Sequence, residues 1–182
     1  MDIDKSILEF FAKFIATRLG IIYDDRNYYQ LHIRLQELCT QLGYPDIKTM
    51  YDKIKLGIPT DVELLLLDIS TNNETLFFRD PKVFDFLKIH LENQLKQNPS
   101  QELHTIWSAA SSYGQEPYSL AMVLCELQDK GCDMSKWSIY ATDISNRALQ
   151  YARNGVYSQL EIQRGLPAPM LVKYFQKAGD FE

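Results

Sequence analysis

Helical periodicity dominates the first 70 residues. Apolar side chains recur at intervals of three and four along this stretch, so each set falls on one face of a helix. Glycine and proline residues between the sets mark the ends of the segments. Four helices are predicted, at residues 3–19, 24–42, 46–56 and 60–70. Together they predict an all-α helical bundle that forms an N-terminal domain over residues 1–70.

The pattern changes in the second half of the chain, where strands alternate with helices. Five elements are predicted there: helices at residues 82–97, 115–128 and 145–153, and strands at 104–109 and 137–142. The order strand, helix, strand, helix is typical of a parallel, doubly wound sheet. We therefore expect a domain boundary near Asn98-Pro99, with residues 71–100 as a linker and residues 101–182 as the start of an α/β domain.

Two strands are too few for the predicted sheet. A doubly wound parallel sheet normally has about five or six strands and helices on both faces. We therefore expect the chain to be a fragment of a longer protein, which we favour over a second copy supplying the missing strands. An uncovered parallel edge is a template for pairing, so we also predict self-association of the truncated sheet.

Composition and charge narrow the class of protein. The net charge of −5 gives no overall field that attracts phosphate, which argues against a nucleic-acid partner. Neither a basic leader nor an apolar run of about 20 residues is present, so we expect a cytoplasmic protein without membrane insertion. The three cysteines lack CxxC spacing and the three histidines lack paired spacing, so we expect reduced thiols and no metal site.

The segment between the first predicted strand and the following helix, residues 107–117, is the first candidate binding element. Its small residues let a ligand approach the backbone, and the free N–H groups of a helix N-terminus favour an acidic group. A dinucleotide fingerprint has three glycines, whereas this turn has only Gly114. Spacing alone leaves ligand binding and a plain structural turn as equal alternatives.

Asp143 is the second candidate, because it follows the second predicted strand directly. An acidic residue at this position in Rossmann-like folds accepts hydrogen bonds from ribose hydroxyls. A helix cap is the competing interpretation, since Asp143 lies two residues before Ser145. The third candidate is the polar run at residues 71–81, in which we expect Phe77 and Phe78 to be core residues.

These three segments, in this order, resemble the chemotaxis glutamate methyltransferase family, CheR. The run TNNETLFFRDP at residues 71–81 is similar to the family's TxNETxFFRD signature. WSAASSYGQEPYS at residues 107–119 resembles its WSAxxSxGEEPYS turn, and ATDI at residues 141–144 resembles its strand end. RNGVY at residues 153–157 is similar to the ARxGxY run that follows. With the N-terminal helices, the resemblance covers essentially the whole chain.

The resemblance implies a fold, a cofactor and a reaction. The fold would be the helical bundle followed by an incomplete Rossmann-like, S-adenosylmethionine-dependent methyltransferase domain. The reaction would move a methyl group from S-adenosylmethionine to glutamate side chains of methyl-accepting chemotaxis receptors, leaving S-adenosylhomocysteine. By the same resemblance the cofactor would contact Asn73, Thr75, Arg79, Glu116 and Asp143. Arg79 would also place the reacting groups and is the one catalytic candidate.

The chain departs from the family pattern at three points. Gln115 replaces the first glutamate of GEEP, and Tyr113 stands where the family often has a small residue. The family's later FCRNVLIYF-like segment, which lines the cofactor pocket, has no counterpart before Glu182. The alternative to an enzyme is therefore a non-catalytic module of the same fold that binds S-adenosylmethionine or docks on a receptor.

Overall fold

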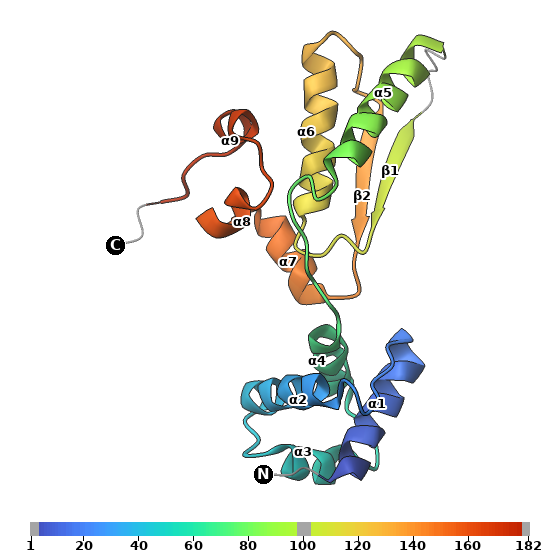
Figure 1. The fold of residues 1–182 in the computed structure, drawn as a ribbon, viewed down its shortest axis with the longest axis vertical. Coiled ribbons are helices and arrows are strands. Elements are labelled where there is room, and N and C mark those ends of the chain that lie inside the picture. The colour runs from blue at the N-terminus through green and yellow to red at the C-terminus, as the bar shows by residue number, and fades with distance from the viewer. Residues whose placement is uncertain (1–3, 98–102, 180–182) are drawn as a thin grey trace. The chain divides into compact units, whose positions relative to one another are not determined.

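A computed structural model describes residues 4–97 and 103–179, and the chain forms two compact units. The first unit ends at Asn72 and the second begins at Asn73. Figure 1 shows the helices and strands along the chain, coloured by residue number. The predicted domain boundary near residues 98–100 and the predicted start of the first helix at Ile3 lie outside the described residues.

Four helices make up the described part of the first unit: α1 (Lys5–Leu19), α2 (Tyr28–Leu42), α3 (Ile47–Ile54) and α4 (Thr60–Ser70). They share one apolar core, to which each helix contributes fully buried side chains such as Phe11, Leu35, Met50 and Leu66. Asp4 and Asp46 cap α1 and α3 by accepting hydrogen bonds from Ser6 N–H and Thr49 N–H.

The start of α2 differs from the sequence prediction by four residues. Residues 24–27 form a turn in which the Asp24 N–H donates to Asn27 Oδ1 at 2.7 Å and the Asn27 N–H donates back to the Asp24 carbonyl at 3.0 Å. Arg26 pairs with the Asp24 carboxylate at 2.6 Å. These local side-chain bonds compete with helical backbone bonds, so the helix begins only at Tyr28.

The second unit contains a small parallel sheet and five helices within the described residues. Its elements are α5 (Pro81–Gln97), β1 (His104–Ala109), α6 (Gln115–Asp129), β2 (Trp137–Thr142), α7 (Asn146–Asn154), α8 (Gln159–Gln163) and α9 (Ala168–Tyr174). β1 pairs with β2 in parallel, with His104 opposite Trp137 and Ala109 opposite Thr142. The βαβα order predicted from the pattern is therefore present, and α8 and α9 are additional elements that the pattern did not predict.

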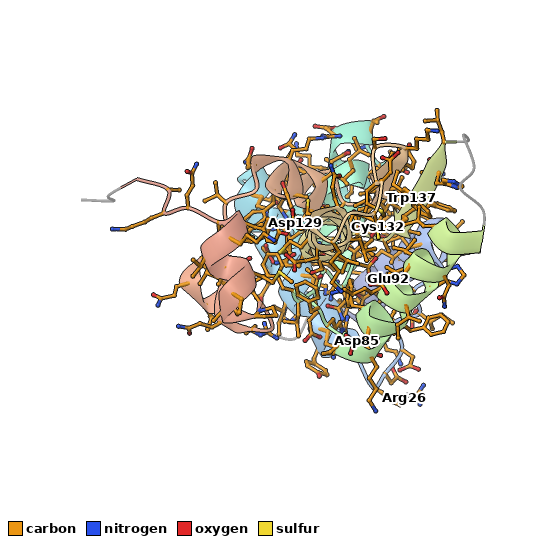
Figure 2. All side chains as sticks on the ribbon, turned by 90° about the horizontal axis from the view of Figure 1, so that it is seen from above. Arg26, Asp85, Glu92, Asp129, Cys132 and Trp137 are labelled. Atoms are coloured by element: carbon orange, nitrogen blue, oxygen red, sulfur yellow. The ribbon has the colours of Figure 1, made fainter. Side chains whose placement is uncertain are left out.

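Among the described residues, the sheet is covered on one face. Ile106 of β1 and Trp137 and Ile139 of β2 pack against a core that α5 and α6 supply, with Leu91 and Leu127 at its centre. Cys132 and Trp137, both labelled in Figure 2, border the same core. On the opposite face Trp107 is 66% exposed and Tyr140 is 62% exposed. The two strands thus form a half-covered sheet.

Helix α9 is attached to α6 by charged side chains. Lys173 Nζ donates to the carboxylates of Glu126 and Asp129, and the Tyr174 hydroxyl donates to Glu126 at 2.7 Å. Hydrogen bonds from Lys173 and Tyr174 lower the pKa of Glu126, and hydrogen bonds to Asp129 and Glu126 raise the pKa of Lys173.

None of the helices in the described ranges is long and apolar enough to cross a membrane.

Candidate functional site

The candidate site lies at the carboxyl ends of β1 and β2, where the chain leaves the sheet. The turn after β1 contains three residues with positive φ: Ala110 at 59°, Ser112 at 51° and Gly114 at 94°. For the two residues that are not glycine this conformation costs on the order of 1 kcal/mol each. The turn is attached to β2 by a 2.9 Å hydrogen bond from the Ser111 N–H to the Thr142 carbonyl. A strained turn of this kind persists only because surrounding contacts hold it.

Asp143 connects the turn after β1 to the start of α7. Its Oδ2 accepts a 2.7 Å hydrogen bond from the Ser112 N–H, and its Oδ1 accepts a 2.8 Å bond from the Ser145 N–H. The cap of α7 is Ser145, whose hydroxyl accepts from the Ala148 N–H at 3.0 Å. Asp143 therefore does not occupy the N-cap position, and each of its oxygens has a second lone pair available for a ligand hydroxyl.

Ser112 brings two of the sequence-predicted residues together. Its hydroxyl donates a 2.7 Å hydrogen bond to the Asn73 carbonyl, while its N–H bonds to Asp143. Ser112 thus links Asn73, near the start of the polar run, to Asp143, which follows β2. Ser112 was not among the site residues predicted individually from the sequence, although a hydroxyl residue in a strand-to-helix turn is a usable signal.

Glu116 lies in the first turn of α6 and faces β1. Its Oε1 accepts a 2.6 Å hydrogen bond from the hydroxyl of Ser108, a buried residue near the end of the strand. Glu116 itself is exposed. Its carboxylate therefore lies beside the turn, at the end of a helix whose N–H groups favour negative charge.

Two buried oxygens, one in the turn and one at the first residue of α6, have no hydrogen-bond partner within the described residues. They are Ser111 Oγ, in a side chain that is 1% exposed, and Gln115 Oε1, in one that is 2% exposed. Buried polar atoms are normally paired with protein, water or ligand. The turn and the start of α6 therefore have both the small residues and the unpaired polar atoms that a polar ligand needs, and S-adenosylmethionine fits this set of groups.

Two phenylalanines anchor the polar run: Phe77 is a core residue, as predicted, whereas Phe78 is half-buried and packs against the margin of the core. Phe77 is fully buried, and its ring contacts Tyr157 and Phe175 at centroid distances of 5.0 and 5.6 Å. Phe78 has a φ of 48°, and its N–H donates to Ser119 Oγ on α6 at 3.0 Å. This anchoring sets the position of the residues on either side of the pair.

Thr75 and Arg79 lie on the same run, outside the hydrogen bonds that join Asn73, Ser112 and Asp143. Thr75 is half-buried, and Arg79 is exposed and donates from Nη1 to the Glu74 carbonyl at 3.2 Å. The Glu74 carboxylate is 3.6 Å from Arg164 Nη2. The structure therefore brings Asn73 and Asp143 together, whereas Arg79 bonds within its own segment.

The fold and the site define a class. A parallel βαβ unit with a small-residue turn after its first strand and an aspartate after its second is the arrangement of nucleoside-binding domains. Residues 73–182 match the family model described as "CheR methyltransferase, SAM binding domain". The chain belongs to this family, which confirms the resemblance and gives S-adenosylmethionine as the ligand of the domain.

The chain is also similar to curated proteins named chemotaxis protein methyltransferase. It is 36% identical over 171 residues to chemotaxis protein methyltransferase 1 of Vibrio cholerae serotype O1, covering 93% of this chain and 62% of that protein. It is 36% identical over 174 residues to chemotaxis protein methyltransferase 1 of Pseudomonas aeruginosa, covering 94% and 63%. Identity to the Escherichia coli protein is 28% over 166 residues, covering 91% and 55%. The chain thus spans less than two thirds of the length of these relatives.

Proposed function

We propose that this chain forms the first part of an S-adenosylmethionine-dependent protein-glutamate O-methyltransferase that acts on chemotaxis receptors in the cytoplasm. The names of its relatives support this activity. The observation that carries the proposal is the bridge by Ser112 between Asn73 and Asp143, because it assembles separate signature segments at the carboxyl ends of two parallel strands.

The proposed cofactor contacts are those that the family resemblance implies, and the chemistry of the Asp143 and Glu116 side chains suits their proposed roles. The Asp143 carboxylate accepts hydrogen bonds from the ribose hydroxyls, and the turn at residues 111–114 allows close approach of the ligand to the backbone. Glu116 lies nearby with a negative charge suited to the amino group or the ribose. Asn73, Thr75 and Arg79 complete the set from the polar run.

The proposed reaction needs no general base. The unperturbed pKa of a glutamate side chain is about 4.3, so the receptor side chain is already a carboxylate at neutral pH. The cofactor supplies a methyl group activated by a positive sulfur. The protein contributes orientation, with the Arg79 guanidinium placing the incoming carboxylate, and orientation of this kind is a major source of rate.

The domain organisation is part of the proposal. The match of the family model to residues 73–182 supports a helical N-terminal domain up to Asn72, followed by an incomplete Rossmann-like methyltransferase domain. The packing of α5 against α6 supports assigning residues 81–97 to the second domain and not to a linker. The uncovered face of the two-stranded sheet supports the incompleteness of that domain.

Calorimetric titration with S-adenosylhomocysteine tests the proposed site. The parent chain should bind, and Asp143→Ala should weaken binding at least tenfold. Asp133→Ala is the matched control, because Asp133 accepts a 3.0 Å bond from the N–H two residues ahead, as Asp143 does, but lies in the loop after α6. Unchanged binding by Asp143→Ala, or no binding by a folded parent chain, would overturn the site assignment.

Methyl transfer is tested separately from binding. The chain is incubated with a receptor cytoplasmic fragment and S-adenosylmethionine labelled in its methyl group, and base-labile label on the receptor is counted. Labelling that is lost in Arg79→Ala supports the enzymatic proposal. Ligand binding without labelling would instead support the alternative, a non-catalytic module that binds S-adenosylmethionine or docks on a receptor.

A further inference from the structure

The RNGVY run at residues 153–157 contains a tyrosine that contacts two segments of the proposed site. Helix α7 ends at Asn154, and Gly155 follows with a φ of 63°, which reverses the chain. A Cβ at Gly155 would lie 2.8 Å from the Tyr118 hydroxyl, so only glycine fits this reversal without displacement. The reversal brings Tyr157 against the turn that follows β1.

The Tyr157 hydroxyl holds the backbone of this turn. It donates a 2.7 Å hydrogen bond to the Tyr113 carbonyl. Gly114 comes next, and a Cβ there would lie 2.8 Å from the same hydroxyl and 2.7 Å from the Cβ of Ala152. The backbone of the turn therefore packs directly on Tyr157 and α7, with no space between them for a side chain.

The ring of Tyr157 holds the other segment. Its edge-on contact with Phe77 has a centroid distance of 5.0 Å, and Phe77 is the fully buried anchor of the polar run. The Tyr157 hydroxyl is protonated at neutral pH and can donate, and burial raises its pKa further above the ordinary value. One side chain thus contacts both the turn and the run from which Asn73 and Arg79 come.

We propose that Tyr157 is a positioning residue for S-adenosylmethionine binding: its hydroxyl fixes the Tyr113 carbonyl and thereby the orientation of Ser112 and Gly114 in the turn after β1. The inference rests on the proposed function, which puts the nucleoside at this turn. The physical reason is preorganisation. A turn with positive φ at Ala110 and Ser112 relaxes when a supporting bond is removed, and the ligand must then restore the bound geometry.

The test compares Tyr157→Phe with Tyr118→Phe in the full chain. Tyr157→Phe removes the bond to the turn and retains the ring contact with Phe77. Tyr118→Phe removes a bond of the same kind, a 2.9 Å bond to the Ala152 carbonyl, which does not belong to the turn. Affinity for S-adenosylhomocysteine should fall roughly two- to tenfold in Tyr157→Phe, the range expected for one hydrogen bond, and should change less than twofold in Tyr118→Phe.

Amide hydrogen exchange gives a second measurement that does not depend on the ligand. The Ser112 N–H bonds to Asp143 and the Gly114 N–H bonds to the Ser111 carbonyl at 3.1 Å. Both amides should exchange faster in Tyr157→Phe, with those of β1 unchanged. Unchanged exchange in Tyr157→Phe, or an equal increase in Tyr118→Phe, would overturn the positioning role. Faster exchange at the turn without ligand binding by any variant would instead contradict the proposed function alone.

Discussion

The N–H of Ser112 donates a 2.7 Å hydrogen bond to Oδ2 of Asp143, and this bond joins the exits of two parallel strands. The same serine donates its hydroxyl to the Asn73 carbonyl, also at 2.7 Å. Ser112, whose backbone is left-handed, is therefore held by bonds to both Asp143 and Asn73. These bonds keep the three signature segments close together.

Ser112→Ala should weaken ligand binding without unfolding the second unit. The substitution removes the hydroxyl bond to Asn73 and retains the N–H bond to Asp143. The expected loss is one hydrogen bond, or roughly two- to tenfold in affinity for S-adenosylhomocysteine measured by calorimetry. Ser138→Ala is the control, since Ser138 is an exposed residue of β2 whose hydroxyl contacts Thr105. Equal affinities of the parent and Ser112→Ala would show that the bridge does not shape the site.

Gly114→Ala should destabilise the second unit by about 2–4 kcal/mol, because the new Cβ would overlap Ala152 and Tyr157 at a φ of 94°. Gly131→Ala has a similar φ of 89° but no atom within 4 Å of the added Cβ, so it should cost only about 1 kcal/mol. Urea unfolding followed by tryptophan fluorescence measures the difference, since Trp107 and Trp137 both lie in the second unit. Equal losses would contradict the close packing at Gly114.

The attachment of α9 to α6 should weaken in acid. Hydrogen bonds from Lys173 and Tyr174 hold the pKa of Glu126 below its ordinary value of 4.5. A lowered folded-state pKa means that the unfolded chain takes up the proton at higher pH. The stabilisation is therefore complete above the unfolded-state pKa and is lost as the pH falls through the folded-state value.

This dependence is measured as the free energy of unfolding between about pH 7 and pH 3. The difference between the parent and Lys173→Met should be largest at neutral pH and should shrink in acid. Lys130→Met is the control. Lys130 lies at the C-terminal end of α6, and its substitution removes a longer 3.4 Å contact with Glu92. A difference for Lys173→Met that stays constant with pH would contradict the role of this ion pair.

The half-covered sheet should make the chain self-associate. Trp107 and Tyr140 expose large side chains on one face of the sheet. Within the described residues, no third strand pairs with the edges of β1 and β2. Light scattering should give a mass that rises with concentration and falls back in Tyr140→Lys. Ile144→Lys changes an exposed apolar residue that lies beyond the strand and should not have this effect. A monomer at every concentration would contradict the prediction.

Local signals in the sequence were enough for most of the secondary structure. Three elements occur with the predicted bounds: the strands at residues 104–109 and 137–142 and the helix Thr60–Ser70. Their bounds depend on hydrophobic periodicity and on helix- and strand-breaking residues, which are local features of the sequence. The start of α2 moved because the bonds between Asp24 and Asn27 form a turn. Helices α8 and α9 have only five and seven residues, too few for a periodic pattern to identify.

The sequence by itself determined the family, the order of elements as far as α7 and the residues that carry the signature, because each of these depends on short contiguous stretches of sequence. Only the tertiary structure decided which of those residues meet. Asn73 and Asp143 come together through Ser112, and the turn rests on Tyr157 from beyond α7. Such contacts form only after the sheet and its helices have packed, so they depend on long-range geometry, which the local pattern does not specify.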